Sequence, residues 1–89
     1  MSVLYKRRNN AQLSDNELEI LHLVNDVGLC SSEQAYEQVS VKYELLFVMR
    51  TMHSLVEKGF LQRILINNKQ LYKTARKYSF VKSYLRNQL

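Results

Sequence analysis

Apolar residues recur at helical spacing in the stretch that follows residue 13. Between residues 15 and 27 they fall three and four positions apart, which places them on one face of a helix. Ser14 and Glu17 match a capping box at the start of this stretch, and Gly28 supplies a residue that tolerates a left-handed backbone at its end. We therefore predict a first helix over residues 15–27.

Two further helices are predicted before residue 60. Ser31 and Gln34 form a second capping box ahead of a short helix over residues 32–39. The third helix is predicted over residues 41–58, with Ser40 as its N-cap and Gly59 as its stop. Its buried stripe is expected to comprise Val41, Leu45, Val48, Met52, Leu55 and Val56.

The pattern changes after Gly59. Residues 61–66 and 70–74 are rich in residues that favour strands, and Asn67 and Asn68 between them tolerate the positive φ of a tight hairpin. From Ala75 onward the apolar spacing is helical again. The predicted fold is mainly α with a small β-hairpin, in the order helix, helix, helix, hairpin, helix, which is that of a winged helix-turn-helix. Residues 1–12 form a basic arm and residues 13–89 a single domain.

Length and composition restrict the class of protein. Eighty-nine residues correspond to one domain, and 46% hydrophobic residues suffice for a small core. The single cysteine excludes an internal disulfide, and there is neither a signal-peptide pattern nor an apolar run long enough to span a membrane. We expect a cytoplasmic, nucleoid-associated protein without membrane contact.

Charge is segregated along the chain. Residues 1–12 carry a net +3 and residues 13–37 a net −6, whereas residues 38–89 carry +8, for a total of +5. A chain polarised in this way favours a polyanionic partner that meets one side of the fold. A merely solvated basic surface is the alternative.

No residue pattern points to catalysis or to a cofactor. His22, His53 and Cys30 lack the spacing of metal ligands, and a structural zinc site needs four ligands. Glycine-rich phosphate loops and nucleophile–histidine–acid sets are also missing from the sequence. We expect a protein that is not an enzyme and that needs no cofactor or metal.

Double-stranded DNA is the partner that the predicted order favours, because one exposed helix fits the major groove and a hairpin can follow the backbone. Arg50 lies at the centre of the outer face of the third helix and can read guanine or hold a phosphate. The candidate DNA-binding residues are Lys42, Tyr43, Leu46, Phe47, Arg50 and His53 of the helix, Arg63, Lys69 and Lys73 of the wing, and Arg7 and Arg8 of the arm.

Leu46 and Phe47 make the outer face of the third helix unusually apolar. They could contact thymine methyl groups, pack against the second helix if the helix is rotated from the predicted orientation, or bind another protein. The third option defines a different functional class, a winged helix that serves as a protein-interaction module.

A homodimer is expected because the last helix is too apolar for so small a core. The candidate interface residues are Tyr78, Val81, Tyr84 and Leu85, with Leu4 and Tyr5 near the N-terminus. A two-fold dimer would present two recognition helices to successive major grooves, and would therefore prefer palindromic DNA.

The segment MHSLVEKGFLQR and the later KQLYKTARK resemble the passage from recognition helix to wing in MarR-like and PadR-like regulators. Leu55, Gly59 and Phe60 match the exit from the helix, and Tyr72 and Thr74 match the end of the wing strand. LSDNELEILHLV is similar to the first helix of the same core, so the resemblance covers about residues 13–77. The stretch from residue 35 to residue 59 is about three residues longer than usual, so either the turn or the third helix is extended.

The resemblance implies a winged-helix transcriptional regulator, most simply a repressor. The compact chain is also similar to small centromere-binding proteins of archaeal plasmid partition, which would spread along DNA from a first site. Binding that grows beyond one palindrome as the protein concentration rises would separate the second role from the first.

Overall fold

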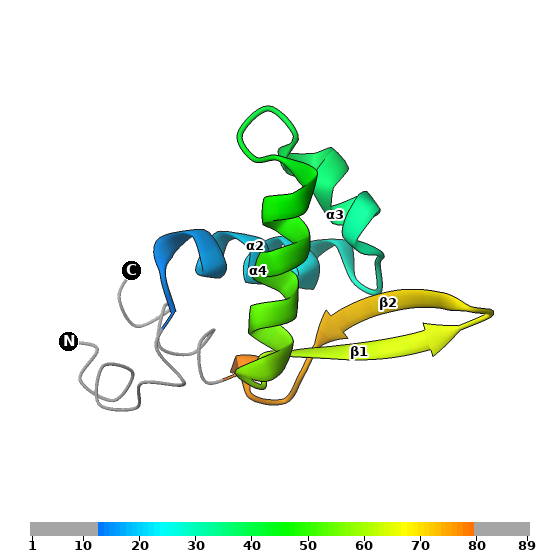
Figure 1. Cartoon of the computed structure of the whole chain (residues 1–89). Coiled ribbons are helices and arrows are strands. Elements are labelled where there is room, and N and C mark those ends of the chain that lie inside the picture. The colour runs from blue at the N-terminus through cyan, green and yellow to red at the C-terminus, as the bar shows by residue number, and fades with distance from the viewer. Residues whose placement is uncertain (1–12, 80–89) are drawn as a thin grey trace.

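The computed structural model describes residues 13–79 and confirms the predicted winged-helix order of its helices and strands (Figure 1). The elements are α2 (Asp15–Val27), α3 (Ser32–Val39), α4 (Leu45–Glu57), β1 (Leu61–Ile66) and β2 (Lys69–Thr74). The predictions for the basic arm and for the last helix, which concern Leu4, Tyr5, Arg7, Arg8, Val81, Tyr84 and Leu85, lie outside the described residues.

The first two helices begin and end where local sequence predicted. The hydroxyl of Ser14 accepts a hydrogen bond from the Glu17 amide, and the Glu17 carboxylate accepts one from the Ser14 amide. Ser31 and Gln34 form the same reciprocal pair at the start of α3. Gly28 follows α2 with φ 88°, a conformation that suits a residue without Cβ.

The prediction that the third helix begins at residue 41 is wrong. Ser40 ends α3 instead of starting α4, Val41 is fully exposed, and α4 begins only at Leu45. The amides of Lys42 and Tyr43 both donate to the Val39 carbonyl and continue the preceding turn. Residues 41–44 therefore belong to the turn between α3 and α4, not to the helix.

The core lies where α4 crosses α2 and meets the base of the hairpin. α4 buries Val48, Thr51, Met52 and Leu55, three of them on the predicted stripe. The other buried apolar residues are Ile20, Leu21, Val24, Cys30, Ala35, Val39, Phe60, Leu61, Tyr72 and Tyr78. Apolar residues with helical spacing thus cover one side of α4 and leave its opposite side to solvent.

Glu17 fixes the C-terminal end of α4 on α2. Its carboxylate accepts hydrogen bonds from the ammonium of Lys58 at 2.8 Å and from the hydroxyl of Ser54 at 2.9 Å. Burial raises the pKa of Glu17, but the bonds from Lys58, the Ser14 amide and Ser54 outweigh it, so the pKa lies below its ordinary value of 4.5. One acidic side chain therefore both caps α2 and holds the end of α4.

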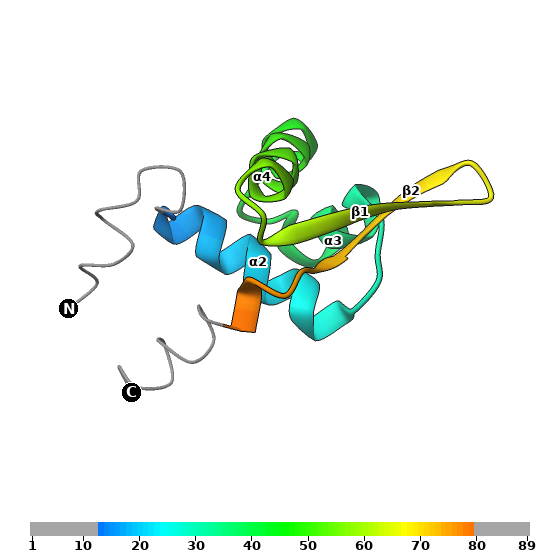
Figure 2. The ribbon, with the colours of Figure 1, turned by 90° about the horizontal axis from the view of Figure 1, so that it is seen from below.

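The hairpin has the predicted turn, and its second strand begins at Lys69, one residue earlier than predicted. β1 and β2 pair antiparallel from Leu61 opposite Thr74 to Ile66 opposite Lys69. Asn67 and Asn68 have φ 51° and 66°, as a two-residue type I′ turn requires. At the hairpin base, Cys30 and Tyr72 exchange two backbone hydrogen bonds, whereas the tip projects away from the body (Figure 2).

The chain returns to the core after β2. The Ala75 amide donates to the Phe60 carbonyl, and a helical turn follows in which the Tyr78 amide donates to the Ala75 carbonyl. The Tyr78 side chain is only 6% exposed, and its hydroxyl lies 2.7 Å from Nδ1 of His22 in a hydrogen bond. Tyr78 thus packs in the core of its own chain, and its predicted place in a dimer interface stays a prediction.

Candidate nucleic-acid interface

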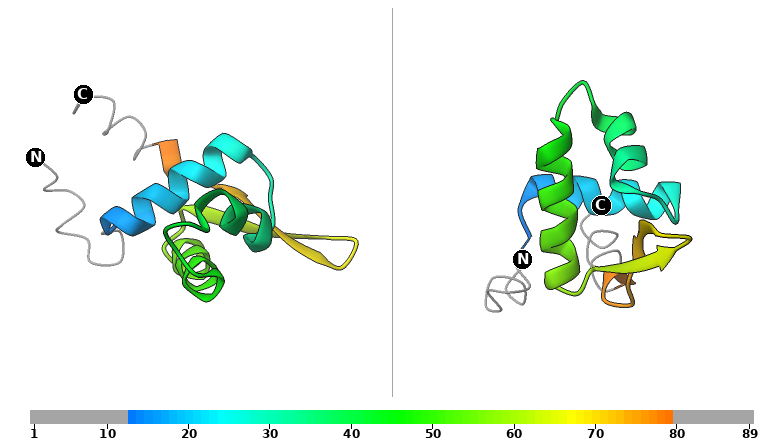
Figure 3. Two further views of the ribbon diagram at one scale, coloured as in Figure 1. Left: turned by 90° about the horizontal axis from the view of Figure 1, so that it is seen from above. Right: turned by 45° about the vertical axis from the view of Figure 1, so that its right-hand side comes forward.

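α4 and the hairpin tip lie on the same side of the molecule. Seen from below and from above, both α4 and the hairpin tip lie closer than α2 to the viewer of Figure 1 (Figures 2 and 3). A flat or grooved partner can therefore contact the exposed side of α4 and the hairpin together. α2, with its four acidic residues, stands behind this surface.

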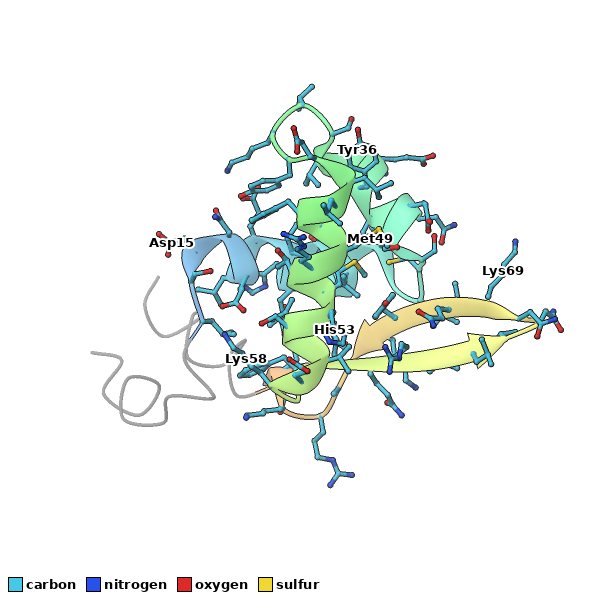
Figure 4. The ribbon with its side chains drawn as sticks, in the orientation of Figure 1. Asp15, Tyr36, Met49, His53, Lys58 and Lys69 are labelled. Carbon is cyan, nitrogen blue, oxygen red and sulfur yellow. The ribbon has the colours of Figure 1, made fainter. Side chains whose placement is uncertain are left out.

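The exposed face of α4 carries the cation Arg50 and, near its end, the carboxylate of Glu57, among apolar and other polar side chains. Leu46, Arg50 and His53 lie at the centre of this face, opposite the buried residues, because each residue turns the helix by about 100°. Leu46 is 55% exposed, and Met49, on the side nearer α3 and the hairpin, is 41% exposed. In Figure 4, Met49 and His53 lie on the side of α4 that is turned toward α3 and the hairpin. His53 also lies 3.3 Å from the Glu57 carboxylate, one turn further on.

Lys42 and Tyr43 were predicted at the start of the recognition helix but lie in the turn before it. The ammonium of Lys42 pairs with Glu19 at 2.9 Å, and the hydroxyl of Tyr43 donates to the same carboxylate at 2.6 Å. The hydrogen bond with Glu19 and its charge raise the pKa of Lys42. These contacts fasten the turn to α2, so the positive charge of Lys42 is already compensated within the chain.

Leu46 and Phe47 do not form one apolar surface. The ring of Phe47 stacks on that of Tyr43 with centroids 4.8 Å apart, and its side chain is only partly exposed. Leu46 remains on the open side of α4. Met49, which the sequence analysis did not single out, is the apolar neighbour of Leu46 on this side. Its position three residues after Leu46 was the signal available in the sequence.

The three predicted wing cations are all exposed but do not share a face of the hairpin. Successive side chains of a strand point to opposite faces of the hairpin, and paired residues of the two strands share a face. Lys69 and Lys73 therefore lie on one face, and Arg63 lies on the other face with Tyr72. No acidic residue occurs between residues 61 and 74, so the hairpin has a net charge of +3.

Within residues 13–79 the cations divide into two groups. Lys42 and Lys58 form ion pairs with α2, and the ammonium of Lys77 donates to the Lys58 carbonyl and lies 4.8 Å from the centroid of the Phe60 ring. By contrast, Arg50, Arg63, Lys69 and Lys73 are exposed and form no ion pair with a carboxylate of the described chain. Arg76, which follows β2, is also exposed and forms no such ion pair. The other four cations lie on α4 and the hairpin, where they can meet external anions.

A hollow of about 400 Å³ separates α4 from the hairpin. It is lined by Ser31, Ser32 and Glu33 at the start of α3, Met49 of α4, and Lys69, Gln70 and Tyr72 of β2. The surface between the two exposed elements is therefore concave. A ridge on a partner, such as a strand of nucleic-acid backbone, can enter it.

Metal binding, thiol chemistry and membrane insertion find no support in the described residues. Residues 13–79 contain no group of three or more histidine, cysteine, aspartate or glutamate side chains placed to hold a metal ion. Burial raises the pKa of Cys30, which disfavours its reactive thiolate. In the same part of the chain, no helix has the length and apolarity to cross a membrane.

Two solved structures share this fold. One, titled "Multiple Antibiotic Resistance Repressor, MarR", matches with a TM-score of 0.75 at 15% identity, over 97% of this chain and 63% of the other. The second, a crystal structure of Streptococcus pneumoniae FabT in complex with DNA, matches with a TM-score of 0.73 at 12% identity, over 86% of this chain and 55% of the other. This chain thus spans less than two thirds of either neighbour.

At these identities the likeness concerns the fold. It confirms the winged helix and the resemblance to MarR at that level. No protein-family model and no curated protein matches the sequence.

Proposed function

We propose that this protein binds double-stranded DNA as a transcriptional regulator, with α4 in the major groove and the hairpin on the adjacent backbone. The observation that carries the proposal is that α4 and the hairpin project toward one side and expose four cations without an ion pair: Arg50 on α4, and Arg63, Lys69 and Lys73 on the two faces of the hairpin. Phosphate neutralisation by such cations releases counterions and provides most of the non-specific affinity for DNA. The FabT neighbour of the same fold was crystallised with DNA, which supports this assignment.

The proposal assigns different roles to the two elements. Arg50 contacts a guanine or a phosphate from the centre of α4, and His53 lies one turn further along the same face. Lys69 and Lys73 contact phosphates from one face of the hairpin. Lys42 contributes no phosphate contact, because its ammonium is held by Glu19.

We further propose a homodimer that binds a palindromic site. The apolar spacing of Val81, Tyr84 and Leu85 continues from the buried Tyr78, and such a stripe suits a second copy of the chain. Two copies of α4 related by a two-fold axis would enter successive major grooves.

The test is fluorescence anisotropy with random-sequence duplex DNA over a series of salt concentrations. We expect affinity to fall steeply with salt, and the slope to be shallower by roughly one to two units in a Lys69→Ala/Lys73→Ala variant. Lys42→Ala is the matched control and should leave the slope unchanged. Sedimentation of the protein without DNA should give the mass of two chains.

The absence of binding at low salt would refute the DNA assignment. In that case the exposed Leu46 and Met49 favour the second candidate, a protein-interaction module, because apolar side chains occupy the centre of protein interfaces. Equal salt slopes for the wild type and the double variant would be consistent with DNA binding but would show that Lys69 and Lys73 of the hairpin do not contact phosphates.

A further inference from the structure

The first two turns of α4 expose apolar side chains that the core does not use. Leu46 and Met49 are 55% and 41% exposed, although Val48, Met52 and Leu55 already fill the buried side of the helix. Both lie on the same side of Arg50 on the open face, and Met49 also borders the hollow beside Lys69. An apolar pair within a helix face that also carries Arg50, His53 and Glu57 fits a partner with both apolar and polar groups.

We propose that Leu46 and Met49 recognise the 5-methyl groups of thymine in the major groove, an inference that rests on the proposed function and adds a specificity to it. The thymine methyl is the apolar group that a base pair presents in that groove. Leucine offers no donor or acceptor, and the methionine thioether is at most a weak acceptor, so methyl contact is the way in which they can distinguish base pairs.

Charge favours DNA over a protein as the occupant of this face. Arg50 shares the exposed face of α4 with this pair, and Lys69 lines the same hollow as Met49, although Glu33 lines it too; neither cation forms an ion pair with a carboxylate of the described residues. The centres of protein interfaces are depleted of charged residues, whereas phosphates line both edges of the major groove. The surroundings of Leu46 and Met49 therefore match a thymine within a polyanion.

The geometry also separates this pair from Phe47 and Leu65. Phe47 is engaged with Tyr43, and Leu65, which is 67% exposed, lies near the hairpin tip away from α4. Leu65 therefore serves as a matched control, since it is an exposed leucine on the element that we assign to the backbone.

The experiment uses the full chain and the duplex recovered by selection from a random 20-base-pair library. The recovered duplex is synthesised twice, once with thymine and once with uracil at every thymine position. Uracil lacks the methyl group but keeps the base-pairing and minor-groove groups of thymine, so contacts with phosphates and the minor groove are unchanged. Anisotropy titrations at one salt concentration then compare the two duplexes.

We expect the thymine duplex to bind more tightly by about fourfold for each methyl group contacted. Leu46→Ala and Met49→Ala should each reduce this ratio, whereas Leu65→Ala should preserve it. Arg50→Ala should weaken binding to both duplexes and leave the ratio close to that of the wild type. Circular dichroism spectra that match the wild type would show that each variant folds.

Equal binding of the thymine and uracil duplexes would overturn the inference while leaving the proposed function intact. Recovered duplexes without preferred thymine positions would overturn it as well, and so would a thymine preference that survives both α4 substitutions. Failure to recover any duplex at low salt would instead count against the proposed function.

Discussion

α4 and the hairpin face the same side of the molecule, but the protein holds them in different ways. α4 buries Val48, Thr51, Met52 and Leu55 along its length and is tied to α2 at its C-terminal end by Glu17. The hairpin buries only Leu61 and Tyr72 near its base, and its tip is exposed on all sides.

The two elements also differ in what they expose. α4 presents Leu46, Met49 and Arg50, whereas the hairpin presents three cations and no acidic residue. A rigid helix with varied side chains suits the reading of bases, which needs fixed geometry, and a basic hairpin suits phosphates, which recur at regular spacing in any sequence. The comparison suggests that specificity and charge attraction are assigned to separate elements.

The largest expected effect concerns how firmly each element is anchored. Leu55→Ala removes a buried side chain of α4 and should lower the free energy of unfolding by about 2–5 kcal/mol. Leu65→Ala makes the same chemical change at an exposed site of the hairpin and should cost less than about 0.5 kcal/mol. Urea denaturation of both variants measures the difference, and equal losses would contradict the distinction.

A smaller effect is expected where α4 leads into the hairpin. Glu17→Gln weakens the bonds to Lys58 and Ser54, so it should lower the free energy of unfolding at pH 7 by about 1–2 kcal/mol. The pKa of Glu17 is lowered by folding, so its contribution is complete above the ordinary value of 4.5 and is lost as pH falls through the folded pKa.

Urea denaturation at several pH values between neutral and acid tests this. The wild type should lose more stability than Glu17→Gln as pH falls below 4.5, and the two proteins should converge at the lowest pH. Glu37→Gln, at an exposed site on α3, should follow the wild type. Parallel curves for the wild type and Glu17→Gln would show that the carboxylate does not hold α4.

The smallest effect is expected at the hairpin tip. Asn68 has φ 66°, so Asn68→Ala should cost about 1 kcal/mol, whereas Asn68→Gly should change the free energy of unfolding by less than about 0.5 kcal/mol. Thermal unfolding followed by circular dichroism measures both. An alanine variant as stable as the glycine variant would indicate that the tip is not held in the type I′ conformation.

Local sequence was sufficient where a signal lies within a few residues. The capping boxes at Ser14 and Ser31 and the Asn67–Asn68 turn form with contacts inside their own segments, so the bounds of α2, α3 and β1 were predictable. Periodicity similarly identified most of the buried side of α4, because a helix that packs on one face must repeat its apolar residues every three to four positions.

Long-range contacts decided what the sequence pattern left open. Ser40 resembles an N-cap, yet Glu19 of α2 binds Lys42 and Tyr43 and holds the following segment as a turn. The same turn engages Phe47 and leaves Leu46 exposed, and the contact with His22 buries Tyr78 in its own chain.

Sequence by itself determined the winged-helix order and the supply of cations. Only tertiary structure determined which cations and apolar side chains remain available to a binding partner. The reason is that each ion pair or ring contact joins residues that are distant along the chain or whose contact helical and strand spacing does not predict.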